Sequence, residues 1–277
     1  MEAALATRVL GAVPLHGGDV ADAFRMELAG GERVFAKTRV PAPPGSFRTE
    51  ALGLQWLGEA DVVAVPRVLA VGDDPPHLVL EWIEEGAPTA RTDSELGREL
   101  AELHRSGAPT FGREDRRPTG SRSLPNDPAD SWVEFYAQRR LRPLARLASE
   151  RAALPAAAIA GLRRVADGLE RVVGPDEPPA RLHGDLWAGN RLVDRSGRNW
   201  LIDPAAFGGH REFDLAMMRL FGGFSDAAFE AYSEAFPLAE GWRDRVALHQ
   251  IAPLVVHAIK FGGGYVAAAS RAILQYA

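Results

Sequence analysis

Three polar residues in one stretch of the chain have the types and the spacing needed to transfer a phosphoryl group. Asp185 can accept a proton from a substrate hydroxyl, Asn190 lies five residues further on, and Asp203 follows an apolar run. An Asn oxygen and a carboxylate are hard ligands that suit Mg²⁺ where it bridges the phosphates of ATP. We therefore predict that Asp185 is the catalytic base and that Asn190 and Asp203 are the metal ligands.

A single Asp or Asn in a loop usually forms a turn or caps a helix. In this chain the polar residues stand in order between two apolar runs, which capping alone rarely produces. The order matches the catalytic loop and the metal-binding Asp of kinases through His183, Gly184, Asp185, Asn190 and Asp203. Protein kinases usually carry Arg at the position of Gly184.

A cation for the phosphates is expected in the first part of the chain. Lys37 ends a predicted strand at residues 33–37, and Glu50 lies on a predicted helix at residues 47–57. Taken alone, these would be an exposed Lys and a Glu on a helix face, as most Lys and Glu are. Together with the catalytic loop, they predict the Lys–Glu ion pair with which kinases hold ATP.

Two further nucleotide contacts are predicted. Gly17 and Gly18 leave two interpretations open, because their backbone N–H groups can approach a phosphate or form an ordinary hairpin turn. The predicted strand at residues 77–82 ends where two lobes should join. Backbone groups near Glu81 and Ile83 are therefore predicted to face the adenine ring.

Hydrophobic periodicity divides the chain into a first part with strands and a second part made mostly of helices. We expect a nucleotide-binding lobe at residues 1–83, a linker at 84–88, and a catalytic and acceptor-binding lobe at 89–277. Strands are expected at residues 12–15, 23–28, 33–37, 68–71 and 77–82. Helices are expected at residues 2–10, 47–57, 131–147, 154–173, 213–221, 227–235 and 246–261, and another should start at a cap formed by Asp93 or Ser94 and run to His104.

Composition excludes several classes of protein. The 277 residues carry a net charge of −5, which gives no electrostatic case for binding nucleic acid. No apolar run is long enough to span a bilayer, and the first residues lack the layout of a secretory signal. The absence of Cys excludes disulfides and thiolate metal sites. We expect a cytoplasmic protein without a membrane partner.

The segment after Asp203 is unusually polar for one that enters an apolar helix. Asp214 either caps that helix or braces the catalytic loop through backbone N–H groups. His210 and Arg211 either face the acceptor or form surface salt bridges. Two aromatic-glycine clusters, at residues 221–224 and 261–265, are expected to end helices, and their likeness suggests a shared pocket wall.

The chain resembles the fructosamine kinase family, within the kinase-like phosphotransferases that include aminoglycoside phosphotransferases and choline kinases. The motifs that carry the resemblance are HGDLWAGN at residues 183–190, DPA at 203–205, GGHRE at 208–212, DLAM at 214–217 and LFGGF at 220–224. Gly17 with Gly18, Lys37, Phe47 with Glu50 and the closing residues 261–265 are similar too. The resemblance covers nearly the whole chain.

The resemblance implies an α+β, bilobal, protein-kinase-like fold, with a five-stranded antiparallel sheet plus a helix in the small lobe and a larger, mainly helical second lobe. It also implies ATP- and Mg²⁺-dependent phosphorylation of the 3-hydroxyl of a ketosamine, either a small-molecule adduct or a glycated protein lysine. The unstable product would free the amine, which amounts to deglycation or protein repair. Trp187, His210 and Arg211 are the implied acceptor-site residues.

Two alternatives remain open from the sequence. The acceptor could be an aminoglycoside, an amino alcohol or another sugar, or the chain could be a non-catalytic protein with a kinase fold. Against the second alternative, Lys37, Asp185, Asn190 and Asp203 are all present. Some relatives form a redox-sensitive, disulfide-linked dimer through a Cys in the glycine-rich loop, which this chain lacks. The sequence leaves the oligomeric state open.

Overall fold

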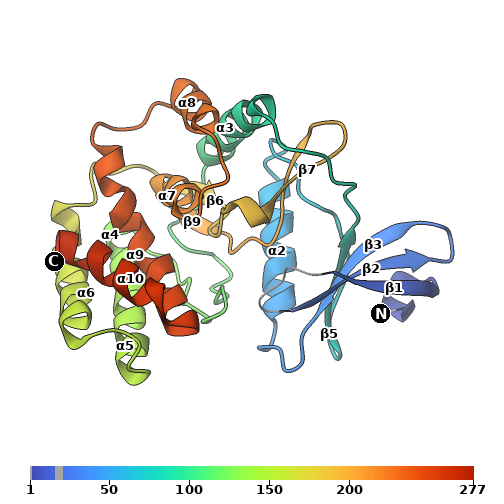
Figure 1. Ribbon diagram of the computed structural model, residues 1–277, viewed down its shortest axis with the longest axis horizontal. Coiled ribbons are helices and arrows are strands. Elements are labelled where there is room, and N and C mark those ends of the chain that lie inside the picture. Colours follow the sequence, from blue (N-terminus) through green and yellow to red (C-terminus); the bar gives the residue numbers. More distant parts are fainter. Residues whose placement is uncertain (1, 16–20) are drawn as a thin grey trace.

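The computed structural model describes residues 2–15 and 21–277, and it shows a sheet at one end of the molecule and a group of helices at the other (Figure 1). The sheet is antiparallel throughout, with strand order β1-β2-β3-β5-β4. This confirms the predicted five-stranded sheet. Its strands are β1 (Val9–Leu15), β2 (Asp22–Leu28), β3 (Arg33–Thr38), β4 (Val68–Asp73) and β5 (Pro76–Glu81).

Helix α2 (Ser46–Gly58) lies between the sheet and the rest of the protein. Its residues Phe47 and Leu54 pack on Leu78 and Leu80 of β5. Leu57, one turn further on, packs instead in a cluster that belongs mostly to the second part of the chain. Apolar residues at spacings of three and four thus let α2 join both parts.

The predicted opening helix at residues 2–10 is wrong in its second half. Helix α1 (Glu2–Leu5) ends early, and Val9 already pairs with Leu28 in the sheet. The backbone N–H of Val9 donates to the Glu2 carboxylate at 2.7 Å. A β-branched residue that can complete a sheet edge gains more from pairing than from one further helical turn.

The second part of the chain is mainly helical, as predicted. Its helices are α3 (Ala90–Arg105), α4 (Trp132–Phe135), α5 (Arg142–Glu150), α6 (Ala156–Gly168), α7 (Glu212–Leu220), α8 (Asp226–Ala235), α9 (Trp242–Phe261) and α10 (Gly264–Tyr276). Two short antiparallel strand pairs complete it, β6 (Ala180–Leu182) with β9 (Phe207–Gly209) and the hairpin of β7 (Arg191–Val193) with β8 (Asn199–Leu201). Within the described ranges, no helix is long and apolar enough to cross a membrane.

Three helix predictions need correction. Thr89, rather than Asp93 or Ser94, caps α3, since its hydroxyl accepts from the N–H of Thr92 at 3.2 Å. The helix expected at residues 131–147 contains a π-helical segment at Tyr136–Leu141. Helix α10 was not predicted, because the glycines after α9 signal an end and give no sign of a restart.

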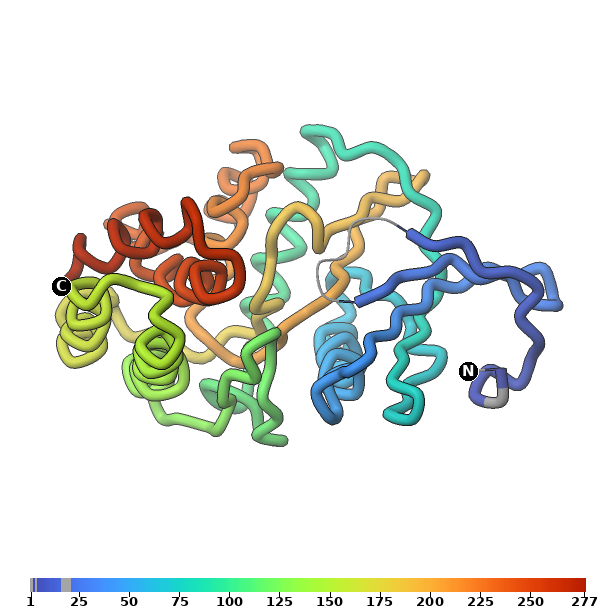
Figure 2. The backbone as a smooth tube through the Cα atoms, turned by 60° about the horizontal axis from the view of Figure 1, so that its bottom comes forward, coloured from blue at the N-terminus to red at the C-terminus, as the bar shows by residue number. Residues whose placement is uncertain are grey.

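The connection between the two parts is fixed by the β7–β8 hairpin. Figure 2 shows the chain leaving β5 and running to α3 past this hairpin. The N–H of Gly86 donates to Val193 O at 2.7 Å, and that of Arg195 donates to Glu84 O at 3.2 Å. Strand β7 begins directly after Asn190, and β8 ends two residues before Asp203. The same hairpin therefore holds both the connection at residues 84–88 and the predicted metal ligands.

Candidate active site

The loop at residues 183–190, between β6 and β7, holds the predicted base. The side-chain nitrogen of Asn190 donates to Asp185 O at 2.8 Å and to Asp185 Oδ2 at 3.3 Å. The structure therefore brings the predicted base and one predicted metal ligand into contact. Gly184 has a φ of 80°, and a Cβ there would lie 2.3 Å from Ala205 O, so no residue with a side chain fits without a backbone shift.

Asp214 on α7 holds this loop through hydrogen bonds to its backbone. Its two carboxylate oxygens accept from the N–H of His183 at 2.7 Å and from that of Gly184 at 2.9 Å. His104 lies 3.3 Å from the same carboxylate and contacts the Tyr232 hydroxyl at 2.8 Å. All of these side chains are buried. Of the two roles considered for Asp214, the structure supports bracing the loop.

His183 connects the loop to the segment that contains Asp203. Burial lowers the pKa of His183, which favours the neutral imidazole. Its Nδ1 accepts from the N–H of Asp185 at 3.2 Å, so its Nε2 carries the proton and donates to Ile202 O at 2.9 Å. Asp203 follows immediately with a φ of 55°, a left-handed conformation that is rare outside glycine. Such strain is often found at functional positions.

Lys37 joins the two parts of the protein at this point. Its Nζ lies 2.6 Å from Glu50 Oε1 on α2 and also forms an ion pair with Asp203. Burial alone would lower the pKa of Lys37, but the two carboxylates outweigh it and raise that pKa. Packing around Asp203 opposes ionisation, yet the charge of Lys37 lowers the pKa of Asp203. Lys37 is therefore a cation that faces the predicted metal ligand.

The two carboxyl groups near this cation have raised pKa values. Burial raises the pKa of Glu50 to about 8, although Lys37 partly offsets the effect. Burial and the charge of Asp203 raise the pKa of Asp185 to about 7, against the opposing effects of Asn190 and Lys260. A carboxylate with a pKa near neutrality is suited to accept a proton from a hydroxyl.

The donor set at the predicted metal site has the chemistry that Mg²⁺ prefers. The nitrogen of the Asn190 side chain is committed to Asp185, so its oxygen is the atom it can offer to a cation. The Asp203 side chain is half exposed, and it lies where its carboxylate is reached from solvent. A small number of oxygen ligands suits Mg²⁺, which keeps several bound waters and is also coordinated by substrate phosphates.

An aromatic surface lies beside the catalytic loop, and we call it the aromatic wall. It is formed by Trp187, Phe221, His257, Phe261 and Tyr265, with ring centroids 5.0–6.0 Å apart between Trp187 and Phe221, Phe221 and His257, His257 and Phe261, His257 and Tyr265, and Phe261 and Tyr265. The aromatic-glycine clusters at residues 221–224 and 261–265 thus do meet. Trp187 and Phe221 are each 38% exposed and Phe261 is 47% exposed, and neighbouring exposed apolar side chains of this kind often mark binding sites.

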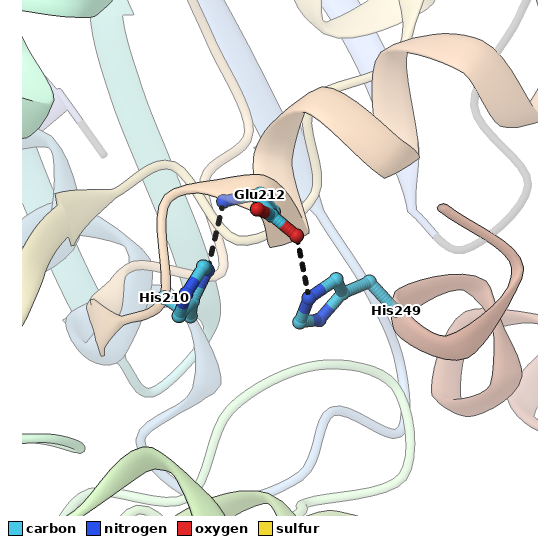
Figure 3. A group of neighbouring side chains, drawn as sticks. All are labelled: His210, Glu212 and His249. Carbon is cyan, nitrogen blue, oxygen red and sulfur yellow. Dashed lines mark hydrogen bonds and ion pairs between the residues drawn. The ribbon is translucent and has the colours of Figure 1, made fainter. Parts of the chain in front are cut away.

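His210 and Arg211 do not face an open surface, so the prediction that they contact the acceptor is corrected. All three guanidinium nitrogens of Arg211 are engaged, with Glu177 at 2.7 and 2.8 Å and with carbonyls of residues 236 and 237. His210 is buried beside Glu212 and His249 (Figure 3). The Arg211–Glu177 pair is also not the surface salt bridge considered as the alternative, because Arg211 is only 4% exposed.

The predicted nucleotide contacts at the sheet are only partly described. Gly17 and Gly18 lie outside the described residues, so the choice between a phosphate loop and a hairpin turn stays open. The Glu81 side chain accepts from the backbone and the side chain of Arg67, both at 2.9 Å. Ile83 follows β5 and is half-buried. The Glu81 side chain is therefore already engaged, and the predicted contact of backbone groups near Glu81 and Ile83 with adenine stays a prediction.

Sequence reasoning did not single out two residues that the structure places close to the catalytic loop. Lys260 lies near enough to Asp185 to lower its pKa. Arg191, which directly follows Asn190, is buried and hydrogen-bonded to α3 and β8. The position of Arg191 next to a predicted metal ligand was a signal in the sequence, but its burial was not.

Comparison with known proteins gives a consistent result. The sequence profile of the fructosamine kinase family matches residues 3–277. A probable ketoamine kinase from Thermus thermophilus is 40% identical over 262 residues, which cover 95% of this chain and 92% of that protein. A chloroplastic protein-ribulosamine 3-kinase from Arabidopsis thaliana is 32% identical over 250 residues, covering 87% of this chain and 75% of that protein.

The fold gives the same answer. The crystal structure of a fructosamine-3-kinase candidate from Thermobifida fusca has 40% sequence identity and a TM-score of 0.89, and the match covers 99% of this chain and 96% of that chain. Solved kinase-like phosphotransferases share the fold at lower identity, which confirms the predicted kinase-like, bilobal α+β architecture. From the profile match over nearly its full length and from these relatives, we conclude that the chain belongs to the fructosamine kinase family, a family of ATP-dependent phosphotransferases.

Proposed function

We propose that this protein uses ATP and Mg²⁺ to phosphorylate the 3-hydroxyl of ketosamines, whose unstable products then release the free amine. The observation that carries the proposal is the meeting of Lys37, Asp185, Asn190 and Asp203 beside the exposed aromatic wall. The names of the relatives, ketoamine kinase and protein-ribulosamine 3-kinase, support a ketosamine as the acceptor.

In this proposal, Asp185 orients the acceptor hydroxyl and takes its proton as the oxygen attacks the γ-phosphorus of ATP. The bond from the γ-phosphorus to the bridging oxygen breaks, and ADP leaves. Asn190 holds the Asp185 carboxylate through its side-chain nitrogen. Lys37, kept in place by Glu50, binds phosphate oxygens once it leaves Asp203. Asn190 and Asp203 would hold Mg²⁺, which supplies positive charge against the phosphates. The proposal assigns ATP binding to residues 1–83, a linker role to 84–88, and catalysis and acceptor binding to 89–277.

The aromatic wall is the proposed acceptor surface. A ketosamine combines a sugar, which has apolar C–H faces, with a secondary amine that is protonated at neutral pH. Exposed rings bind both groups, the first by stacking and the second by cation–π attraction of about 0.5–2 kcal/mol. Trp187 is the proposed first contact, because it lies in the catalytic loop two residues after Asp185.

The test is Mg²⁺-dependent ADP release from the purified protein across a panel of acceptors. The panel contains fructosyl-lysine, ribulosyl-lysine, a glycated protein, an aminoglycoside, choline and a blank without acceptor. Turnover confined to ketosamines is the expected result, and the relative rates on free and protein-bound adducts identify the physiological class. Turnover on the aminoglycoside or on choline alone would overturn the assigned acceptor while leaving the phosphotransfer site intact.

A further inference from the structure

Asp93 is a buried carboxylate whose two oxygens bind partners from different segments. It lies in the first turn of α3 and is 6% exposed, although it does not cap that helix. Its Oδ1 accepts from Arg191 Nη1 at 2.6 Å. Its Oδ2 accepts from the Ser225 N–H at 2.9 Å and from the Ser225 hydroxyl at 2.5 Å. One side chain therefore ties together residues 191 and 225.

The first partner fixes the end of the catalytic loop. Arg191 follows Asn190 directly, and its side chain is buried among acceptors. Its Nε and Nη2 lie 3.0 and 2.7 Å from Asn199 Oδ1, and its Nη2 also lies 3.1 Å from the Thr92 hydroxyl. The guanidinium is thus held by residues of α3 and β8, which limits how far the Arg191 backbone can shift. The position of Asn190, one residue earlier, is constrained by the same bonds.

The second partner of Asp93, Ser225, is the last residue of a segment that begins at Phe221 in the aromatic wall. Residues 221–225 run from Phe221, at the end of α7, to Ser225, which precedes α8. This segment touches the catalytic loop along its length. Phe221 meets Trp187 edge to face at 6.0 Å, and the Arg191 guanidinium lies 5.9 Å from the Phe224 ring. Gly223 has a φ of 87°, and a Cβ there would lie 2.4 Å from Ala188 Cβ.

Asp93 and Arg191 balance each other's charge in this buried arrangement, so neither can be lost without leaving the other unpaired. Burial would raise the pKa of Asp93, but the bonds from Ser225 and Arg191 outweigh it and lower that pKa. A buried ion pair is costly to break one partner at a time, since the other charge is left uncompensated. Charge-assisted hydrogen bonds are also shorter and about twice as strong as neutral ones. Asp93 is therefore able to fix geometry in both of the segments it binds.

We propose that Asp93 is a positioning residue that holds the metal ligand Asn190 and the acceptor-binding aromatic wall in a fixed relation to each other. The proposal rests on the function proposed above, and it extends the site to a side chain that contacts neither ATP nor acceptor. It predicts that a change at Asp93 weakens Mg²⁺ use and acceptor binding together. A change on the Ser225 side alone weakens only acceptor binding.

The test compares Asp93→Asn with Ser225→Ala, and Glu102→Gln serves as the control. Glu102 lies on the same helix, but its side chain is half exposed and pairs with Arg105, which is also exposed. Asp93→Asn should raise both the acceptor KM and the Mg²⁺ concentration for half-maximal rate by about tenfold, the scale of one charge-assisted hydrogen bond. Ser225→Ala should raise the acceptor KM several-fold and leave the Mg²⁺ requirement unchanged. Glu102→Gln should change neither.

An activity-independent measurement guards against misfolding and against a wrong acceptor. Binding of Mn²⁺ together with ADP is titrated by calorimetry for wild type, Asp93→Asn, Arg191→Ala and the conservative variant Arg191→Lys. Weaker metal–nucleotide binding in Asp93→Asn, with partial recovery in Arg191→Lys relative to Arg191→Ala, supports the proposal even if no ketosamine is a substrate. Unchanged binding and unchanged KM values, with only a lower melting temperature, would overturn it.

Discussion

Lys37 on β3 forms an ion pair with Asp203, which lies 166 residues further along the chain. The pair joins the sheet to the segment that follows β8. Lys37 Nζ also lies 2.6 Å from Glu50 Oε1 on α2. A residue of the proposed phosphate clamp and a proposed metal ligand are thus in direct contact. The position of one part of the molecule relative to the other is tied to the residues that are proposed to bind ATP.

The role of Lys37 predicts a defect in nucleotide use. Lys37→Ala should raise the ATP KM and lower kcat, with a combined loss in kcat/KM of about 10²-fold or more, because a cation is lost from the transferring phosphoryl group. Steady-state kinetics with varied ATP measure the effect. Arg33→Ala, which removes an exposed cation from the same strand, is the control and should stay within about twofold of wild type. Equal losses of kcat/KM in both variants would show that Lys37 has no specific role in ATP binding or catalysis.

The aromatic wall predicts a defect in acceptor binding rather than in ATP binding. Trp187→Ala should raise the acceptor KM by about tenfold and leave the ATP KM unchanged, since ring stacking and cation–π attraction contribute roughly 0.5–2 kcal/mol. Trp187→Phe should retain part of the affinity. Leu274→Ala, which shortens an exposed apolar side chain on α10, is the control. An acceptor KM that does not respond to Trp187→Ala would show that the acceptor binds elsewhere.

Asp214 predicts a coupled loss of stability and turnover. Asp214→Ala leaves the buried N–H groups of His183 and Gly184 without their acceptors, and each unsatisfied group costs about 1–3 kcal/mol. The unfolding free energy from urea titration should fall by roughly 2–5 kcal/mol, and kcat should fall even where the variant is fully folded. Asp226→Ala, at an exposed carboxylate, should do neither. A variant with normal kcat would show that the loop holds its shape without Asp214.

The buried residues around Glu212 predict a dependence of stability on pH. Burial lowers the pKa of His210 to about 4, whereas the unfolded chain has a value near 6.5. Between these values the unfolded state binds the proton and the folded state does not, so stability is lost as the pH falls. Between pH 7 and 5 the loss from His210 should be roughly 2 kcal/mol. The pKa of Glu212 is lowered to about 2, so its contribution is lost only at more acidic pH.

Urea unfolding at pH 7 and pH 5 tests this prediction in wild type and His210→Asn. An Asn oxygen can replace His210 Nδ1 as acceptor for the Glu212 N–H. The variant should lose less stability than wild type over the same pH range, whatever its stability at pH 7. Identical losses in the two proteins would mean that other groups cause the acid sensitivity.

Local signals in the sequence were enough to predict the sheet and to single out Asp185 and Asn190, which the structure shows in contact. Strands with alternating polar and apolar residues, and a catalytic loop of a few residues, depend on residues that are close in sequence. Both can therefore be predicted from the sequence. His210 and Arg211 were misplaced because polarity next to Asp203 looks the same whether the side chain is exposed or paired in the core. Arg211 is buried because Glu177 and two carbonyls surround it, and none of these is near it in sequence. The joint role of Asp93, Arg191 and Ser225 likewise depends on three distant segments.

The central claim is that Asp185 serves phosphoryl transfer to the 3-hydroxyl of a ketosamine. The most direct measurement is NMR of the product formed from fructosyl-lysine, ATP and Mg²⁺, with ADP measured in the same samples, for wild type and Asp185→Asn. We predict phosphate on the 3-hydroxyl in amounts equal to ADP, and a rate at least about 10²-fold lower in Asp185→Asn, with ATP binding retained. Phosphate on another group, or a near wild-type rate in Asp185→Asn, would contradict the account.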